Sequence, residues 1–542
     1  MLTLRDIPGP TAIVFEQTCA AELRRRRKAG KAVDPDKRVF INPAVCEGCG
    51  DCSVQSNCIA IEPLETEFGR KRRINQSACN KDFSCVKGFC PAFVTIKGAK
   101  LASRHSEAPD TSKLPDPVLP PLDRPWNIAI AGVGGSGILT IGAILGMAAH
   151  LEGKVPLVMD MAGLAQKGGA VLSHIRLSTH DQPPTAPRIA NGGADVLLAA
   201  DAVVGASREA IALCDPDVTQ AVMNTHLTPV SDFVRLRNFD FQQNAVAQVV
   251  ASSVRTQHFH NFSAKAVAVA GDEIAANMMM LGYAWQMGLI PLARRSINRA
   301  IQMNGVAVQA GLDGFDWGRA IAHDPTVVDP VAALEPMDLA ALTAHRAAHL
   351  TRYQDSGLAA KYLAVLKQAQ TAVQHLGNGD EILIAIARNY AKLLSYKDEY
   401  EVARLYTDPA FQAALDDQFA GTYRMTFHLA PPFLPGRAPN GRPAKRAFGG
   451  WMMTGFKGLA RLKVLRGTWF DPFGYTTERR AERALIAQYE ADIGRLSGLS
   501  ANTALALMSL PDDIRGFGPV KARSRDIAAI KRAELLEHPK GT

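Results

Sequence analysis

The chain has 542 residues with a net charge of +9, and 47% of its residues are hydrophobic. This length is enough for about three to four domains with packed cores. The charge is modest for this length and is not arranged in a repeated basic stripe, so the composition disfavours a nucleic-acid-binding protein.

The first 37 residues are predicted to contain a short strand and a basic helix. The apolar run TAIVFEQ (11–17) is the strand candidate, and CAAELRRRRKAG (19–30) is the helix candidate. An isolated strand needs neighbours to pair with, so this one is expected to be a remnant or an edge that pairs elsewhere. For the dense basic run Arg24–Lys28, a solvated helix face or an acidic partner is favoured over nucleic acid.

Residues 38–100 form a cysteine-rich module that contains seven of the nine cysteines. The start of the chain has neither the basic segment nor the long apolar run of a secretory signal. We therefore expect a cytoplasmic, reducing environment, in which closely spaced cysteines are metal ligands rather than disulfides.

The stretch CEGCGDC places Cys46, Cys49 and Cys52 in a C-x2-C-x2-C run. Such a run supplies three thiolates to one iron–sulfur cluster, and in two-cluster ferredoxins the fourth comes from a Cys-Pro pair in the other half of the motif. Cys90, which precedes Pro91, fits this role. These four cysteines are predicted to hold a [4Fe–4S] cluster, and zinc is disfavoured because it prefers paired CxxC motifs.

A second cluster is predicted on Cys58, Cys79 and Cys85, although three thiolates leave it one ligand short. The spacing from Cys79 onward is also stretched, to C-x5-C-x4-C. Several alternatives stay open: a fourth ligand from Asp82 or from another chain, a three-iron cluster, or a structural role for these cysteines.

Residues 101–124 are rich in proline, serine and aspartate, which is typical of a linker. From 125 to 328, apolar strands such as NIAIAGV, VPLVMD and ADVLLAAD alternate with helical patterns, as in a doubly wound, Rossmann-like α/β domain. The uncharged run 126–151 is long enough to span a membrane. Its glycines favour a strand, a turn and a buried helix instead.

The loop GVGGSG (132–137) matches G-x-G-x-x-G through Gly132, Gly134 and Gly137, with Gly135 between them. This pattern between a strand and a helix binds dinucleotide phosphates, and Asp160 at the end of the next strand is placed to bind a ribose. The same loop suits coenzyme A or another phosphate, or serves only as a tight turn.

The segment MAGLAQKGGAVLSHIR (161–176) contributes one exposed cation, Lys167, on a glycine-rich backbone. Lys167 is expected either to contact a phosphate or carboxylate, or to lie in a loop that packs on a neighbouring subunit. His174 falls in an apolar strand pattern and is expected to be structural.

Residues 329–542 are predicted to be mostly helical, because long stretches such as KYLAVLKQAQTAVQHL have helical periodicity. Within RGTWFDPFGYTTERR, the charged residues Arg466, Asp471, Arg479 and Arg480 are expected to form buried ion pairs. Binding of coenzyme A phosphates by these arginines is the alternative.

Taken in order, the stretches CEGCGDC, CNKDFSCVKGFCP, GVGGSGILT and DMAGLAQKGGAVLSHIR resemble those of indolepyruvate ferredoxin oxidoreductases of the large single-chain bacterial type. The resemblance continues through GDEIAANMMMLGYAWQMGLIP, YKDEYEVARLY and LPDDIRGFGPVK, so it covers nearly all of residues 11–525. These enzymes are thiamine-dependent 2-oxoacid:ferredoxin oxidoreductases.

The resemblance implies decarboxylation of a 2-oxoacid on thiamine diphosphate with Mg²⁺, electron transfer through iron–sulfur clusters to ferredoxin, and transfer of the acyl group to coenzyme A. It also implies that residues 125–328 are a γ domain, which disfavours NAD. The sequence lacks the GDG…N motif that holds thiamine diphosphate, and residues 1–37 resemble the tail of the missing domain. We therefore expect the C-terminal half of such an enzyme, inactive alone, with the thiamine site on a separate chain.

The fold expected overall is multidomain: a ferredoxin-like module, a Rossmann-like γ domain and a mostly helical C-terminal domain. The assembly is expected to be dimeric and to have no membrane or nucleic-acid partner. Two other functions stay open from the sequence. One is an iron–sulfur electron-transfer protein that uses NAD(P) through the glycine loop, and the other is an inactive remnant or scaffold.

Overall fold

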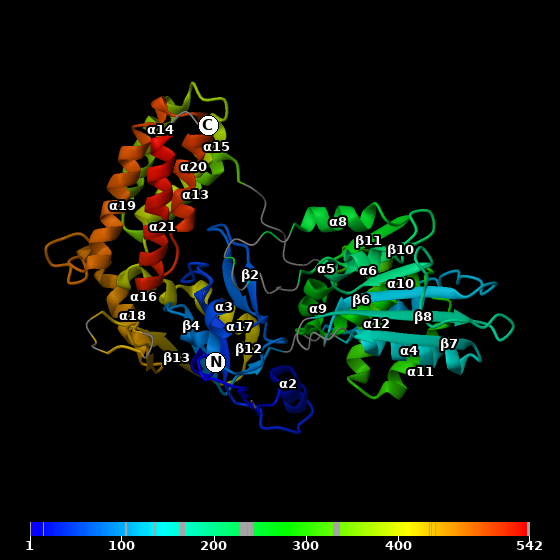
Figure 1. The fold of residues 1–542 in the computed structure, drawn as a ribbon. Helices are drawn as coiled ribbons and strands as arrows, with labels where there is room; N and C mark the ends of the chain where they lie inside the picture. The colour runs from blue at the N-terminus through cyan, green and yellow to red at the C-terminus, as the bar shows by residue number, and fades with distance from the viewer. Residues whose placement is uncertain are drawn as a thin grey trace.

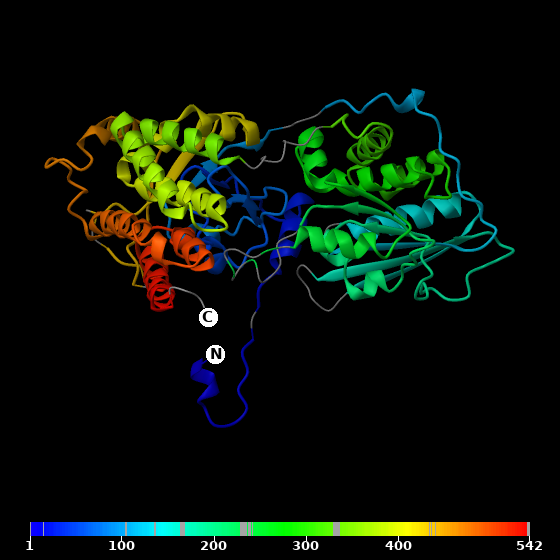
Figure 2. The ribbon, with the colours of Figure 1, turned by 90° about the horizontal axis from the view of Figure 1, so that it is seen from above.

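The computed structural model describes residues 2–538 with some gaps, and all structural statements concern the described residues. The gaps are 15, 103–105, 135–136, 163–168, 228–232, 234–235, 237–239, 241, 329–336, 433, 435 and 439–440. Two lobes lie side by side in both views (Figures 1 and 2). One is the α/β domain, and the other combines the cysteine-rich module with the C-terminal helices.

The α/β domain is built on a six-stranded sheet with the order β11-β10-β9-β6-β8-β7. Its strands are β6 (Trp126–Val133), β7 (Val155–Ala162), β8 (Ala170–Ser178), β9 (Val196–Ala199), β10 (Gln220–Asn224) and β11 (Thr256–His260). Strands β6, β9, β10 and β11 are parallel, whereas β8 is antiparallel to β6 and to β7. In a Rossmann sheet the second strand lies beside the first. Here β8 separates β6 from β7, so the sheet departs from the doubly wound order expected from the sequence.

Helices cover both faces of this sheet. One face packs on α4 (Ile138–Leu151), α9 (Phe262–Ala270), η3 (Glu273–Ala275), α10 (Ala276–Gln286), α11 (Arg294–Asn304) and α12 (Val308–His323). The other face packs on α5 (Ala202–Gly205), α6 (Arg208–Ile211) and α8 (Gln243–Ala251). Both faces are buried because successive residues of β6 point to opposite sides: Ile128 and Ile130 enter the first core, and Ala129 enters the second.

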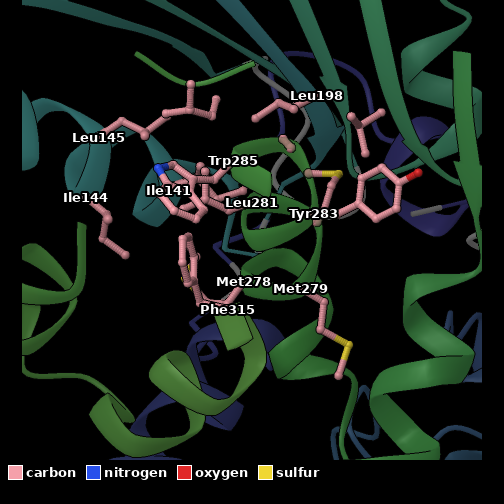
Figure 3. Packing of buried hydrophobic residues seen from close by; sticks show 14 of the residues in the cluster. Ile141, Ile144, Leu145, Leu198, Met278, Met279, Leu281, Tyr283, Trp285 and Phe315 are labelled. Atoms are coloured by element: carbon pink, nitrogen blue, oxygen red, sulfur yellow. The ribbon is translucent and has the colours of Figure 1, made fainter. Parts of the chain in front are cut away.

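The first core is centred on α10 and its contacts with α12 and α4, as Figure 3 shows for Trp285 and Phe315. Glycines allow α10 and α12 to approach at backbone distance. A Cβ built on Gly318 of α12 would lie 2.0 Å from the carbonyl oxygen of Met279 in α10. A Cβ on Gly282 of α10 would likewise lie 2.0 Å from the carbonyl oxygen of Phe315, so neither position has room for a side chain.

The second lobe joins the cysteine-rich module to the C-terminal part of the chain through shared sheets. The module contains β1 (Arg38–Ile41), α3 (Asp51–Ser56), β2 (Ile61–Leu64), β3 (Lys71–Ile74), η1 (Ser84–Lys87), β4 (Phe93–Lys97) and β5 (Lys100–Leu101). The C-terminal part contributes the strands β12 (Phe419–Ala420), β13 (Arg424–Leu429) and β14 (Arg446–Phe448). The antiparallel order β1-β4-β13-β14 makes one sheet from both segments, and β12 pairs with β5.

Two hydrophobic cores stabilise this lobe. Aromatic residues of the C-terminal part pack onto the module strands, with Tyr406, Phe427 and Phe456 in mutual ring contact beside Phe93 and Phe40. A separate helical core lies between α13, α14, α15, α19 and α20. The helices and 3-10 turns are α13 (Leu339–Tyr353), α14 (Ser356–Val373), α15 (Gly379–Leu394), α16 (Glu399–Thr407), α17 (Pro409–Gln418), α18 (Met452–Arg461), η4 (Leu462–Leu465), α19 (Thr477–Ile493), η5 (Leu496–Gly498), α20 (Ala501–Ser509), η6 (Leu510–Asp513) and α21 (Gly518–Glu537).

The remaining elements are α1 (Leu2–Arg5), α2 (Ala20–Lys28) and η2 (Thr111–Lys113) in the linker. The run TAIVFEQ, predicted as a strand, belongs to no strand among its described residues. Across the described part of the chain, no helix has both the length and the apolar content needed to cross a bilayer. The uncharged run 126–151 folds as β6, a turn and α4, as the glycines indicate.

Candidate metal centre

The structure separates the seven clustered cysteines into two sets. The first set, Cys46, Cys49, Cys52 and Cys90, lies in the loop after β1, at the start of α3 and just before β4. Burial is the largest cause that raises the thiol pKa values of Cys49, Cys52 and Cys90, and each is raised further by other members of the set. For Cys90 the pKa reaches about 11. Because the charges of these four thiols influence one another's ionisation, their sulfur atoms lie close together and can serve as one group of metal ligands.

The loop of the first set turns tightly around its sulfur atoms. Gly48 and Gly50 have φ of 64° and 77°, a backbone conformation that favours glycine. A Cβ on Gly48 would also lie 2.1 Å from the carbonyl oxygen of Arg70. The loop brings the Gly48 amide within 3.3 Å of Cys46 Sγ, to which it donates a hydrogen bond. Such donors stabilise a thiolate, the form that binds metal.

The second set, Cys58, Cys79 and Cys85, lies after α3, after β3 and within η1. Burial, followed by the charges of Cys79 and Cys58, raises the pKa of Cys85 to about 12. The negative charge of Asp82 also raises the pKa values of both Cys79 and Cys85. The Lys81 amide donates to Cys79 Sγ at 3.4 Å. The two sets have the same members as the two groups predicted from the sequence. Asp82 interacts with members of the second set.

A single zinc ion and an iron–sulfur cluster require different separations between the sulfur atoms of their ligands. Zn–S bonds of about 2.3 Å in a tetrahedral site place sulfurs about 3.8 Å apart. Within the described chain, no three cysteine sulfurs lie within 4.8 Å of one another. A cuboid cluster binds each thiolate at a different iron and so holds its sulfur ligands farther apart than one zinc ion does. Among the described residues, no disulfide closes either set.

Cations surround the first set. Arg72 is 0% exposed, and its charge acts on Cys52, Cys46 and Cys49. Its guanidinium lies 4.3 Å from the ring of Phe233 in the α/β domain. In the cysteine loop, burial opposes ionisation of Glu47, but nearby lysines outweigh it and hold the pKa of Glu47 well below its usual range. Positive charge of this kind suits an anionic group bound by four thiolates.

A cation from the N-terminal helix lies beside the second set. Arg24 of α2 donates to the Ala78 carbonyl at 2.8 Å, and Arg27 donates to the Asn80 carbonyl at 2.7 Å. The charge of Arg24 interacts with Cys58 and Cys79. Arg24 and Arg27 of the basic run therefore bind the cysteine-rich module of the same chain. The sequence predicts a solvated helix face or an acidic partner for this run, and neither describes these two arginines.

A polar contact joins the module to the α/β domain. Glu62 of β2, His226 after β10 and Glu273 of η3 have ligand atoms within 4.8 Å of one another. Glu62 already accepts hydrogen bonds from Arg73 at 3.1 Å and from Asn75 at 2.6 Å. Burial and Glu62 raise the pKa of Glu273. This group joins β2 of the module to His226 and η3 of the α/β domain.

The glycine loop lies between β6 and α4, as predicted. Gly132 is closely packed, since a Cβ there would lie 2.5 Å from Ile138 Cδ1. Gly137 has φ of 93° and caps α4 without a side-chain hydrogen bond. The Gly134 amide donates to the Gly169 carbonyl at 2.8 Å. Gly135 and Lys167 lie outside the described residues.

Asp160 does not lie where a ribose-binding acid is expected. It belongs to β7, which β8 separates from β6 and its glycine loop. Its carboxylate accepts a hydrogen bond of 2.5 Å from Ser173 Oγ on the neighbouring strand. The sheet order therefore removes the main support for the NAD(P) interpretation.

The charged residues of the aromatic stretch are largely structural, as expected. Arg466 pairs with Asp398 at 2.6 Å, Arg479 lies 3.4 Å from Glu399, and Asp471 accepts a hydrogen bond from Tyr400 at 3.0 Å. Arg480 is exposed. His174 is fully buried and accepts the Ile189 amide at 3.2 Å, which is also a structural role.

The C-terminal part places further cations beside the first cysteine set, and no sequence motif indicates them. Lys397 Nζ pairs with Glu47 at 2.5 Å and donates to the Cys46 carbonyl at 3.2 Å. Lys445 and Arg442 contact the module from the other side. These residues lie some 350 positions from the cysteines along the chain, so no local pattern could have identified them.

Comparison with known families matches two segments of the chain. Residues 127–320 match the family described as pyruvate ferredoxin/flavodoxin oxidoreductase, and residues 339–534 match DUF6537, a family of unknown function. Residues 127–320 coincide with the α/β domain, and 339–534 with the C-terminal helices and strands.

Curated relatives include proteins named indolepyruvate oxidoreductase subunit IorB. The one from Pyrococcus horikoshii is 27% identical over 205 residues, which are 37% of this chain and 96% of the relative. That from Methanothermobacter thermautotrophicus is 29% identical over 203 residues, 35% of this chain and 96% of the relative. A third, from Archaeoglobus fulgidus, is 41% identical over 73 residues, 14% of this chain and 34% of the relative.

Solved structures that match part of the chain include pyruvate oxidoreductase subunit PORC from Thermotoga maritima, with 17% identity and a TM-score of 0.28 over 36% of this chain and 97% of that one. The γ subunit of a keto/oxoacid ferredoxin oxidoreductase from Geobacter sulfurreducens has 21% identity and a TM-score of 0.26 over 36% and 98%. The family match and the curated relatives agree with the resemblance seen in the sequence. Residues 127–320 therefore form a domain similar to the pyruvate ferredoxin/flavodoxin oxidoreductase family.

Proposed function

We propose that this chain is the electron-transferring component of an indolepyruvate, or other aryl 2-oxoacid, ferredoxin oxidoreductase. The observation that supports this most is that two buried cysteine sets and a pyruvate ferredoxin/flavodoxin oxidoreductase domain occur in one chain. The relatives named indolepyruvate oxidoreductase subunits support the substrate class.

In this proposal the first set, Cys46, Cys49, Cys52 and Cys90, holds one [4Fe–4S] cluster, and the second set holds another. When bound, such clusters take up electrons one at a time from the thiamine-bound intermediate and pass them to ferredoxin. The residues of this chain bury the sulfurs, donate amide hydrogen bonds to them and supply compensating cations.

Two side chains are candidates for the fourth ligand of the second set. Asp82 acts on Cys79 and Cys85, and Cys19 directly precedes α2, whose Arg24 contacts the Cys79 loop. Loss of the true fourth ligand should convert a four-iron cluster into a three-iron one, with its distinct electron paramagnetic resonance (EPR) signal. Asp82→Ala and Cys19→Ser identify which residue it is, and an unchanged spectrum in both would assign the ligand to another chain.

We further propose that the glycine loop, together with Lys167, binds a phosphate of coenzyme A. The support is the uncapped N-terminus of the fourteen-residue helix α4, where amide groups and the helix dipole favour an anion. Calorimetric titration with coenzyme A should give binding that is weakened by Lys167→Met. Binding of NADH but not of coenzyme A would contradict this assignment.

Thiamine diphosphate and Mg²⁺ are proposed to lie on a partner polypeptide, since the relatives are named as subunits. The test combines this chain, loaded with iron under anaerobic conditions, with the thiamine-binding chain. Reduction of ferredoxin should then depend on indolepyruvate, on coenzyme A and on this chain. A Cys46→Ser variant should lose most of that activity, and equal activity without this chain would refute the proposal.

A further inference from the structure

The domain that matches a family of unknown function contacts the proposed first cluster site directly. We propose that this domain sets the reduction potential of the cluster held by the first cysteine set, and that Lys445 is the residue chiefly responsible. This inference rests on the proposed function, because it needs a cluster at that site. It assigns a role to a segment whose family has none.

The backbone of this domain fixes Lys445 against the module. Lys445 directly precedes β14, the last strand of the sheet β1-β4-β13-β14. Its Nζ donates to the carbonyl oxygens of Val86 at 2.9 Å and of Gly88 at 2.7 Å, in the turn that leads to Cys90. The ammonium also lies 5.0 Å from the ring centre of Phe93. Three contacts with the module hold the charge in place.

The charge of Lys445 acts on members of both cysteine sets. Its charge interacts with Cys90 and Cys52 of the first set, and with Cys85 of the second. Among the charged groups that act on Cys90, Lys445 has the largest effect. The ammonium is therefore close enough to affect charge on the sulfurs of both sets, and the first set receives most of this effect.

Two other cations of this domain, Arg442 and Lys397, have carboxylate partners in the module. Arg442 bonds Asp51 at 2.9 and 3.0 Å, and Asp51 in turn accepts the Phe89 amide at 2.7 Å. Lys397 pairs with Glu47. Lys445, by contrast, bonds two main-chain carbonyls, which do not cancel its charge. Among the described residues, Lys445 is the one of these three cations whose hydrogen bonds go to main-chain carbonyls and to no carboxylate.

The sign of the effect follows from charge. Reduction adds one electron to a cluster with four thiolate ligands, so a nearby cation stabilises the reduced form more than the oxidised form. Net charge and hydrogen bonding around the sulfurs are known determinants of cluster potential. The effect is strong because a buried site has a low effective dielectric constant. Removal of the Lys445 charge should make the potential more negative.

The test compares Lys445→Gln with Lys445→Arg in the full chain, purified anaerobically and loaded with iron. Glutamine keeps a donor for the two carbonyls and removes the charge, whereas arginine keeps the charge. In an EPR-monitored redox titration, Lys445→Gln should lower the ratio of reduced to oxidised first cluster at least tenfold at fixed potential. For a one-electron couple this is a shift of about 59 mV to more negative values. Lys445→Arg should stay near the wild type.

Lys457→Gln is the matched control, because Lys457 is an exposed lysine on α18 of the same domain. It should leave the potential unchanged. A fully loaded Lys445→Gln protein with the wild-type potential would overturn the inference but leave the proposed function intact. Loss of iron in Lys445→Gln but not in Lys445→Arg would also overturn it, since Lys445 would then act in cluster assembly. Wild-type protein that binds no iron would instead refute the proposed function.

Discussion

Gly88 is the position where a single methyl group should separate the two halves of the first cysteine set. Gly88 caps η1 with φ of −54°, which alanine adopts without strain, so Gly88→Ala tests space alone. Its Cβ would lie 2.9 Å from Cα, 3.0 Å from Cβ and 3.1 Å from N of Cys52. Ordinary contact begins at 3.4 Å, so α3 and η1 must move apart by about 0.5 Å.

Most of these atoms are backbone, so the clash cannot be relieved by rotating a side chain. Overpacking of this kind costs about 1–3 kcal/mol, and it displaces Cys52 relative to Cys90. Urea unfolding should report the loss of stability, and iron analysis should report a smaller content per chain. Gly377→Ala is the control, because nothing lies within 4 Å of its Cβ and its φ is not positive. A Gly88→Ala protein with wild-type stability and iron content would refute the reasoning.

Three further predictions concern the scaffold. Gly318→Ala should destabilise the α/β domain by about 3 kcal/mol, because its Cβ would meet the Met279 carbonyl; thermal unfolding measures this. Arg466→Met should cost about 3–5 kcal/mol in urea unfolding, because Asp398 would be left as a buried unpaired charge. Burial, aided by nearby cations, lowers the pKa of His260 from 6.5 to about 4. As pH falls, the unfolded chain therefore binds a proton at His260 before the folded chain does. The stability that the neutral imidazole provides is complete above pH 6.5 and is lost as pH falls through about 4. His260→Phe should make the melting temperature depend less on pH in this range.

The sequence predicts local elements well because each is specified by its own residues. The apolar runs around Ile130 and Leu198 become β6 and β9, and the uncharged segment after Gly137 becomes α4. It does not predict that β8 lies between β6 and β7. Periodicity identifies a strand but says nothing about which strand it pairs with, and the error over Asp160 follows from this.

The same limit applies to the candidate site. Spacing alone divides the cysteines into two sets, because ligands of one cluster lie on short loops. The cations could not be found in this way, since Lys445 reaches Gly88 only through the pairing of β13 with β4. Ion pairing of Arg466 was predictable in kind, because a guanidinium among aromatic residues needs a partner, but the identity of Asp398 was not.

The iron content of the full chain tests the central claim most directly. Protein purified and reconstituted without oxygen should be brown and contain about eight iron and eight sulfide per chain. Cys46→Ser should reduce the iron to about half and remove the EPR signal of one cluster while the other remains. Fewer than about two irons per chain after reconstitution would contradict the account.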